Sequence, residues 1–300
     1  MDKSPKILHR MPDVRTISLP CLLLVITPAI LLAVGPARLE KTFDTKPDPQ
    51  ISLTNLRGHI VIRGWERSQV HALCLTASPR VEVEGSAMPA TGPAERVVFS
   101  TRVLDPLVRG NDESADCNLD VPAEASLEIR NRQGSVQVEH LQGQHASIDS
   151  ADGRIVATDV AGHLTARSLG GDIEIVRSSG RVEANSITGN LTFTEPTSKN
   201  LRGNTNSGHI LYTGNFESSG EYILSTYSGD IEVVVPPSAS FELNAKTVKG
   251  KVENAFKLQP KRHAPSSLGY GNSLFGTHNT GNATVDLTSF SGHVRVRPSH

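Results

Sequence analysis

The chain has few of the residues that build a large compact core or a reactive site. Aromatic residues make up 4% of its 300 residues, and it has one tryptophan and three cysteines. Thirty lysine and arginine residues are offset by 31 aspartate and glutamate residues, which leaves a formal net charge of −1. Without a global basic field, we expect no nucleic-acid partner.

Sequence signatures of catalysis are also lacking. We find no nucleophile elbow, phosphate-binding loop or paired catalytic carboxylate, and no two histidines at metal-ligand spacing on a helix. We therefore expect no catalytic residues, no cofactor and no bound metal.

What the chain does contain is an internal repeat, seen most clearly in Leu164 to Ile175, LTARSLGGDIEI. Apolar residues lie seven positions before and two positions after each repeat glycine, in the period-two alternation of strands with one buried face. Each repeat therefore predicts two short strands joined at a glycine. We call these nine residues the pivot glycines: Gly58, Gly134, Gly153, Gly171, Gly189, Gly208, Gly229, Gly250 and Gly292.

A second position of the repeat, three residues before each pivot glycine, always holds a small polar residue. By parity this position faces inward, so its side chains are expected to hydrogen-bond turn backbone that would otherwise be buried unpaired. The glycine supplies either a positive φ or room for a neighbouring coil. The column consists of Asn55, Asn131, Ser150, Ser168, Ser186, Thr205, Thr226, Thr247 and Ser289.

The spacing of the pivot glycines predicts the architecture. From Gly134 to Gly250 it stays between 18 and 21 residues, which favours parallel stacking of equivalent strands. We predict an all-β parallel β-solenoid over residues 51–300, with about nine units rising about 4.8 Å per coil. A left-handed hexapeptide helix is disfavoured because no apolar residue recurs every six positions.

Residues 65–120 keep the alternation but lose the polar column, so we expect an irregular N-terminal cap with an acidic loop at 112–120. Cys74 and Cys117 are the two cysteines beyond the apolar N-terminal run. In an oxidising compartment they either form a disulfide or remain separate thiols, and the sequence leaves both open.

The N-terminal residues 1–37 combine a basic head with an uncharged stretch from Thr16 to Ala37. This pattern is typical of a signal peptide or an uncleaved membrane anchor, whereas a cytosolic protein with a buried helix is the alternative. We expect export to the periplasm or cell surface, or anchoring in the inner membrane with the domain outside the cytoplasm. Residues 38–50 are predicted to be a polar tether, because Pro47 and Pro49 discourage regular structure.

An insertion at residues 255–280 interrupts the repeat before a final strand pair at Thr284 to Val296. It contains no acidic residue, so it is either a recognition loop displayed by the scaffold or a flexible excursion. Its candidate recognition residues are Lys257, Lys261, Arg262, His263 and Tyr270.

Three segments carry a family resemblance: SGDIEVVVP at Ser228 to Pro236, GGDIEI at Gly170 to Ile175 and TSFSGHVRV at Thr288 to Val296. They resemble the bacterial putative-adhesin family of exported β-strand-repeat proteins, a domain of unknown function. The resemblance implies an exported β-solenoid with an adhesive or scaffolding role and no catalytic residues. The expected partner is an envelope protein or a surface glycan.

Two other functions fit the sequence. One is a membrane-tethered regulatory or stress-sensing partner of another envelope protein. The other is a polysaccharide-acting β-helix enzyme, in which Arg154, Glu174, Arg181 and Glu183 line a groove on the outer face.

Polar turn residues also raise the question of metal binding. The turn aspartates either form a calcium ladder or, as we favour, hydrogen-bond backbone. Histidines follow three pivot glycines but belong to distant coils. These residues are Asp149, Asp152, Asp172, Asp230, His59, His209 and His293.

Overall fold

The computed structural model describes residues 37–104, 113–260 and 272–299. The chain divides into two compact units, Met1–Ala33 and Val34–His300, and all described residues belong to the second. The expected signal peptide or anchor therefore falls almost wholly outside the described residues. Among the residues that are described, no helix is long and apolar enough to cross a membrane.

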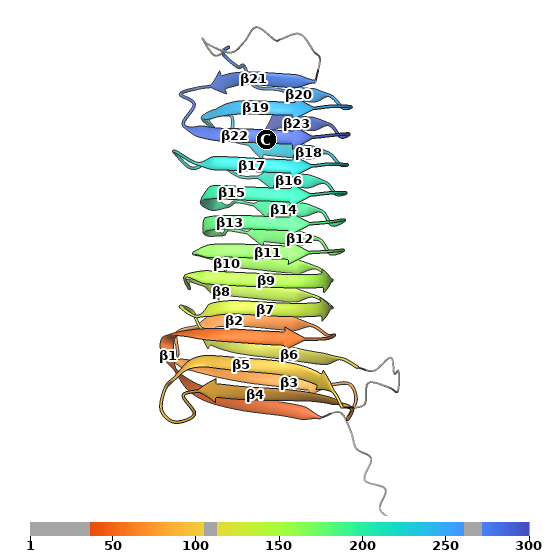
Figure 1. Cartoon of the computed structure of the whole chain (residues 1–300). Helices are drawn as coiled ribbons and strands as arrows, with labels where there is room; N and C mark the ends of the chain where they lie inside the picture. The colour runs from red at the N-terminus through yellow and green to blue at the C-terminus, as the bar shows by residue number, and fades with distance from the viewer. Residues whose placement is uncertain (1–36, 105–112, 261–271, 300) are drawn as a thin grey trace, which may run out of the picture. The chain divides into compact units, whose positions relative to one another are not determined.

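Residues 126–254 form a stack of coils, each made of one strand from each of two facing sheets, A and B (Figure 1). The register places equivalent repeat positions side by side: Leu164 pairs with Val182 in sheet B, and Ile173 pairs with Leu191 in sheet A. The predicted parallel β-solenoid is confirmed. Sheet B contains β7 Ser126–Gln133, β9 His145–Asp152, β11 His163–Ser168, β13 Ser179–Ser186, β15 Thr197–Thr205, β17 Glu221–Thr226 and β19 Phe241–Thr247. Sheet A contains β8 Val136–Leu141, β10 Ile155–Val160, β12 Ile173–Val176, β14 Leu191–Thr194, β16 Ile210–Thr213, β18 Ile231–Val235 and β20 Val252–Asn254.

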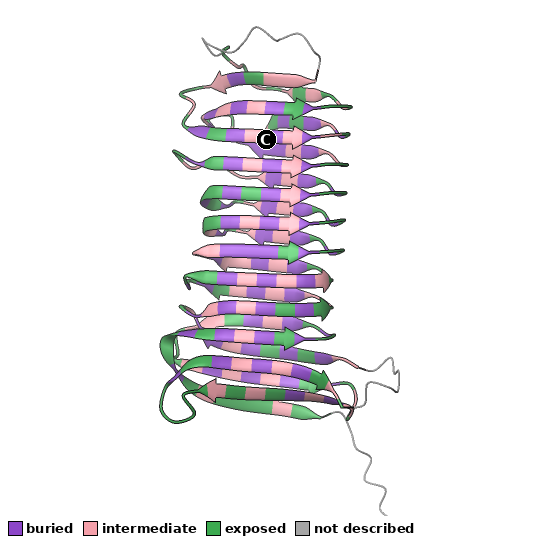
Figure 2. Ribbon diagram, viewed as in Figure 1, coloured by how far each residue is buried: buried purple, intermediate pink, exposed green. Residues whose placement is uncertain are grey.

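The core between the sheets is thin and mostly aliphatic. Burial alternates along most strands of the stack, as the banding of Figure 2 shows, because successive strand residues point to opposite faces; β11 and β18 each have three successive buried residues. Near the C-terminal end the core becomes aromatic, with Tyr212, Phe216, Tyr222 and Phe241 in contact. Burial raises the pKa of both tyrosines, and the Tyr222 hydroxyl donates to the Ser198 carbonyl oxygen at 2.8 Å.

The last strand pair does not end the stack, although its place in the sequence suggests that it does. β22 (Ala283–Ser289) lies between β17 and β19, and β23 (Val294–Pro298) lies between β18 and β20. The coil of β19 and β20 is terminal because residues after β20 fold over it: the Phe256 ring packs edge-on against Phe241 at 5.3 Å. β21 (Ser273–His278) then adds to β19 as an antiparallel edge strand.

At the other end, the first repeat stacks on the second despite the long insertion between them. β1 (Arg38–Asn55) pairs with β7, and β2 (Ile60–Trp65) pairs with β8. The insertion forms the expected cap, with β3 and β6 extending sheet A and β4 and β5 extending sheet B. Its strands are β3 Gln69–Thr76, β4 Val81–Met88, β5 Ala94–Val103 and β6 Ala115–Pro122.

Two expectations about the cap require correction. Residues 38–50 are not a tether, because Arg38–Asp44 pair antiparallel with β3, and the two prolines produce only a register break between Thr45 and Gln50. The expected acidic loop is largely strand β6. Its buried Ala115, Cys117 and Leu119 alternate with polar residues. This period-two pattern is typical of a strand, and the segment forms one although it is rich in acidic residues.

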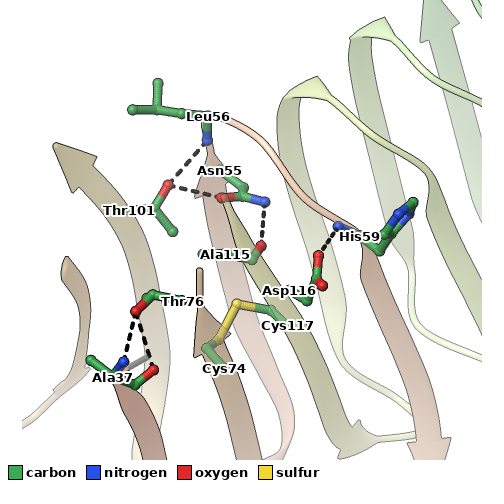
Figure 3. The surroundings of a disulfide bond; sticks show 10 residues. All are labelled: Ala37, Asn55, Leu56, His59, Cys74, Thr76, Thr101, Ala115, Asp116 and Cys117. Carbon is green, nitrogen blue, oxygen red and sulfur yellow. Dashed lines mark hydrogen bonds between the residues drawn. A yellow bond between two sulfur atoms is a disulfide. The ribbon is translucent and has the colours of Figure 1, made fainter. Parts of the chain in front are cut away.

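Cys74 of β3 and Cys117 of β6 lie directly opposite each other and form a disulfide (Figure 3). Both are buried within the cap. The bond ties together two strands separated by 43 residues in the chain.

Candidate functional site

Every coil turns at two corners, and the first, which contains the pivot glycine, is called here the glycine corner. All nine residues of the polar column are buried there. Ser186 shows the recurring arrangement: its hydroxyl donates to the Gly171 carbonyl oxygen of the preceding coil at 3.3 Å and accepts from the Gly189 amide at 2.9 Å. The column therefore satisfies turn backbone from coil to coil, as the sequence predicts.

The pivot glycines are required by close approach. A Cβ atom built on Gly171 would lie 1.9 Å from the carbonyl oxygen of Gly153, and one built on Gly189 would lie 2.0 Å from that of Gly171. Neither residue has a positive φ. The sequence left open whether the glycines supply a positive φ or leave room for a neighbouring coil. At Gly171 and Gly189, in the middle of the stack, they leave room for the neighbouring coil.

The same corner displays apolar side chains to solvent. The residues two positions before the pivot glycines form a row that we call the corner stripe. In stacking order it comprises Leu56, Arg132, Ala151, Leu169, Ile187, Asn206, Tyr227, Phe290 and Val248. Its large exposed members are Leu56 at 37%, Leu169 at 57%, Ile187 at 49%, Tyr227 at 57% and Val248 at 60% of full exposure.

The backbone beneath the corner stripe is already hydrogen-bonded between coils. The Ile187 amide donates to the Ser168 carbonyl oxygen at 3.2 Å, and the Tyr227 amide donates to that of Thr205 at 3.3 Å. These bonds hold successive stripe residues near the coil spacing of about 4.8 Å. The stripe is thus a fixed row of side chains on a paired backbone.

Aromatic rings gather towards the C-terminal end of the corner stripe. Tyr227 and Phe290 stack with their centroids 4.6 Å apart and an interplanar angle of 4°. The Lys249 ammonium lies 5.1 Å from the centroid of Phe290, in cation–π range. Tyrosine and phenylalanine are enriched in protein interfaces.

At its N-terminal end the corner stripe borders a shallow groove of about 450 Å³. Leu56 and Leu169 line it together with Arg130, Arg132 and Arg167. Arg130 pairs with Glu128 at 2.6 Å and Arg167 with Asp149 at 3.5 Å.

Four column residues line the same groove, and in two of them a buried side-chain oxygen has no partner among the described residues. These atoms are Asn131 Oδ1 and Ser150 Oγ.

Charge is unevenly distributed around the glycine corner. Positions one, two and four before the pivot glycines carry six cationic side chains against two anionic ones, so these rows have a net charge of +4 in a chain of −1. The cations are Arg57, Arg130, Arg132, Arg167, Lys246 and Lys249, and the anions are Asp149 and Asp152. The row just after the glycines is balanced, with Arg154 and Lys251 against Asp172 and Asp230.

The opposite corner, called here the charged corner, is built differently. Four successive coils place a non-glycine residue in the left-handed region: His140, Asp159, Arg177 and Glu195, at φ values of 57°, 54°, 48° and 48°. Arg177 bonds Asp159 through two nitrogens at 2.7 and 2.9 Å, and the hydrogen bond from Arg177 lowers the pKa of Asp159. Asp159 also pairs with His140, at 3.4 Å, so three of the four side chains are linked.

The residues proposed for polysaccharide cleavage do not share a groove. Arg154 forms an ion pair with Glu174 on the outer side of sheet A. Arg181 pairs with Glu183 at 2.6 Å on sheet B. The expectation of one outer face lined by all four residues is therefore wrong, because the coil turns between the two pairs.

Asp172 and Asp230 accept hydrogen bonds from the amides of Asn190 and His293 in the neighbouring coils, both at 2.8 Å. This is the backbone-bonding role that the sequence analysis favours. His209 follows the same pattern, since its Nδ1 accepts from the Asp230 amide at 3.1 Å. The described residues contain no group of three or more metal-binding side chains.

Of the candidate recognition loop, the structure describes Lys257, which is exposed. Its carbonyl oxygen lies 3.1 Å from the Nδ1 atom of His278. Lys261, Arg262, His263 and Tyr270 lie outside the described residues.

The corner stripe was not predicted from the sequence, although its apolar residues recur at one position of the repeat. Once the glycines are aligned, Leu169, Ile187, Tyr227, Val248 and Phe290 occupy one position. Alternation assigns that position to neither sheet face, because it lies within the turn. Its apolar content becomes informative only when the turn is known to be exposed.

Comparison with known families places one part of the chain. Residues 189–297 match the family described as Toastrack DUF4097. This match confirms, over that range, the resemblance to a domain of unknown function inferred from the sequence.

Two solved structures match this chain at low sequence identity. One is described as a "putative adhesin" of Bacteroides fragilis, with 13% identity and a TM-score of 0.40, covering 88% of this chain and 97% of that chain. Another is described as a "putative cell adhesion protein" of Clostridium sporogenes, with 11% identity and a TM-score of 0.30, covering 88% and 100%. No curated protein matches this chain.

Proposed function

We propose that this protein is an exported, non-catalytic β-solenoid that binds or scaffolds a partner at the cell envelope. The observation that carries the proposal is the corner stripe: a row of exposed large apolar side chains held in register by hydrogen-bonded backbone along the stack. Soluble proteins seldom leave such a row uncovered unless it contacts a partner. The basic head and uncharged stretch at the N-terminus support export.

The outer-face charges also support binding rather than polysaccharide cleavage. Each candidate catalytic arginine is paired with a carboxylate on its own sheet, and the two pairs face different directions. Surface pairs of this kind are common on solvated sheet faces. The rigid stack is therefore best suited to displaying a surface.

The first experiment concerns location. The full chain is expressed in a bacterial host, the cells are fractionated, and the N-terminus and mass of the product are determined. A mature chain beginning near Arg38 in the periplasm or medium supports a released binding module, and an intact Met1 in the inner membrane supports a tethered one. A product confined to the cytosol contradicts the proposal.

The second experiment concerns binding. Purified full chain is incubated with envelope fractions, and the bound amount is measured by sedimentation before and after protease treatment of the envelope. Saturable binding is expected, and binding no greater than that of an unrelated globular protein contradicts the proposal. Cleavage of an acidic glycan that is lost in Arg181→Ala would instead establish the enzyme alternative.

A further inference from the structure

The corner stripe has a linear shape and a definite length. Nine coils give eight steps of about 4.8 Å, so the stripe extends for about 38 Å along the stack. Large apolar side chains occupy it one per coil, interrupted at Arg132, Ala151 and Asn206. A partner that covers it must therefore be elongated and must present a narrow apolar face.

The backbone beneath the corner stripe excludes one common mode of recognition. A strand added to a sheet edge binds through free amides and carbonyl groups. The stripe amides of Leu169, Ile187 and Tyr227 already donate to the neighbouring coil. A strand lying along the stripe would gain no ladder bonds and would leave its own backbone groups unpaired.

An α-helix does not have this difficulty, because its backbone bonds are internal. One helical turn rises about 5.4 Å, close to the coil spacing of about 4.8 Å, so turns and stripe residues stay near register over a few coils, and about seven turns face the nine coils in all. A helix of about 26 residues would cover the whole stripe.

The flanking charges specify the character of that helix. The stripe and the rows one and four residues before the pivot glycines together carry a net charge of +4, with Arg130, Arg132 and Arg167 near one end and Lys246 and Lys249 near the other. A complementary helix is acidic beside its apolar face. A second copy of this chain is disfavoured, because pairing two glycine corners would juxtapose like charges.

The exposed side chains of the corner stripe favour a protein partner over a glycan partner. Leucine, isoleucine and valine at four of the coils offer apolar area but no hydrogen bonds to sugar hydroxyls. Tyrosine and arginine, which also occupy the stripe, are enriched at energetically important positions of protein interfaces.

We infer that the corner stripe is the docking surface for an acidic amphipathic helix of a partner protein. The inference deepens the proposed function and rests on it. Ile187 and Tyr227 provide central apolar contacts, and Arg132 provides an electrostatic contact. The strands of the sheet faces position the stripe but do not touch the helix.

The test uses the full chain and a synthetic probe, a fluorescein-labelled 26-residue helix with leucine at the a and d positions of its heptads and glutamate beside them. A peptide of the same composition, with its order scrambled to remove the apolar face, is the control. Binding is measured by fluorescence anisotropy at low and high salt. The ordered peptide is expected to bind, more weakly at high salt, and the scrambled peptide is not.

The double variant Ile187→Ser, Tyr227→Ser is expected to weaken binding at least about tenfold. Leu75→Ser is the matched control, since Leu75 is 47% exposed and Ile187 is 49% exposed, and Leu75 lies on β3 away from the stripe. It is expected to leave the affinity unchanged. Arg132→Glu is expected to weaken binding and flatten its salt dependence. Unchanged circular dichroism and melting midpoints verify that the variants fold.

Several outcomes overturn the inference: equal binding of the ordered and scrambled peptides, no binding of either, or an equal loss in Leu75→Ser. A stripe variant that alters sedimentation of the chain alone would identify a second copy as the occupant. An acidic glycan that binds the wild type and fails to bind the double variant would identify a sugar partner. If the double variant still binds envelope fractions, the inference fails and the proposed function stands; if the wild type does not bind them, the proposed function fails.

Discussion

Both corners pack glycines closely from coil to coil, as a Cβ built on Gly162 would lie 2.2 Å from the Gly143 carbonyl oxygen, but they differ in the residues that surround the glycines. At the glycine corner the neighbouring carbonyl oxygen occupies the space of a side chain, so Gly171 and Gly189 have no alternative residue. At the charged corner the chain reverses with Asp159 and Arg177 in the left-handed region and their side chains outside. That conformation costs about 1–2 kcal/mol for a non-glycine residue.

The two corners differ in which of their residue positions are free to vary. The glycine corner is constrained on its inner side by the column and the neighbouring carbonyl groups, so its variable and exposed position is the corner stripe. The charged corner also has buried polar residues, Ser178 and Ser198, and the Ser198 hydroxyl donates to the Gly180 carbonyl oxygen at 2.6 Å. The exposed positions there, Asp159 and Arg177, form a surface ion pair, whereas those of the glycine corner are mostly apolar.

The largest effect is expected from a side chain placed in the glycine stack. Gly171→Val should destabilise the protein by about 4 kcal/mol or more, because its Cβ would lie 1.9 Å from the Gly153 carbonyl oxygen. Asp172→Val should cost only about 1 kcal/mol, since Asp172 is exposed and loses one hydrogen bond to the Asn190 amide. Urea denaturation of both variants tests this difference, and equal losses would contradict the steric role of the pivot glycine.

A smaller effect separates two serines of the buried column. Ser186→Ala should cost about 1–3 kcal/mol, because it leaves the Gly171 carbonyl oxygen and the Gly189 amide without their side-chain partner. Ser150→Ala should be neutral or slightly stabilising, since the Ser150 hydroxyl is buried without a partner among the described residues. The unfolding midpoints of the two variants, measured under the same conditions, test this difference. Equal destabilisation would show that the column acts by packing alone.

At the charged corner, Arg177→Gly should change the stability by less than about 1 kcal/mol. Glycine removes the strain of a left-handed arginine, but it adds unfolded-state entropy and removes a surface ion pair worth at most about 1 kcal/mol. Thermal unfolding in parallel with Gly171→Val provides the contrast. A loss as large as that of Gly171→Val would mean that the two corners are equally constrained.

The sequence predicts the coils because side-chain parity records which residues face inward. Ile173, Ile175 and Ser168 keep their repeat positions, and the structure buries all three. The order of stacking is not encoded in the same way. The strand pairs around Gly250 and Gly292 follow the same repeat, so the pattern does not say which of them stacks on β17 and β18. In the structure β22 pairs with β17, and the coil of β19 is terminal, with Phe256 packed on Phe241.

The candidate site was predicted less well for a related reason. A pattern of period two describes strands, whereas the corner stripe lies in turns, and Leu169 or Tyr227 alone resembles an isolated exposed residue. At the charged corner the repeated glycines Gly143, Gly162 and Gly180 give a signal, but the left-handed residues do not. His140, Asp159, Arg177 and Glu195 share a backbone conformation without sharing a residue type.

The smallest expected effect is the acid dependence of the charged corner. Hydrogen bonding to Arg177 holds the pKa of Asp159 below its ordinary value, so the unfolded chain takes up a proton at Asp159 at a higher pH than the folded one. The stabilisation by this pair is therefore complete above the unfolded pKa, near 4, and is lost as pH falls through the lower folded pKa. Because Arg177 is half exposed, the contribution is below about 1 kcal/mol. Asp159→Asn should lower the stability slightly at neutral pH and leave it unchanged in acid. If the variant remains less stable than the wild type in acid, the effect comes from the left-handed backbone rather than from the charge.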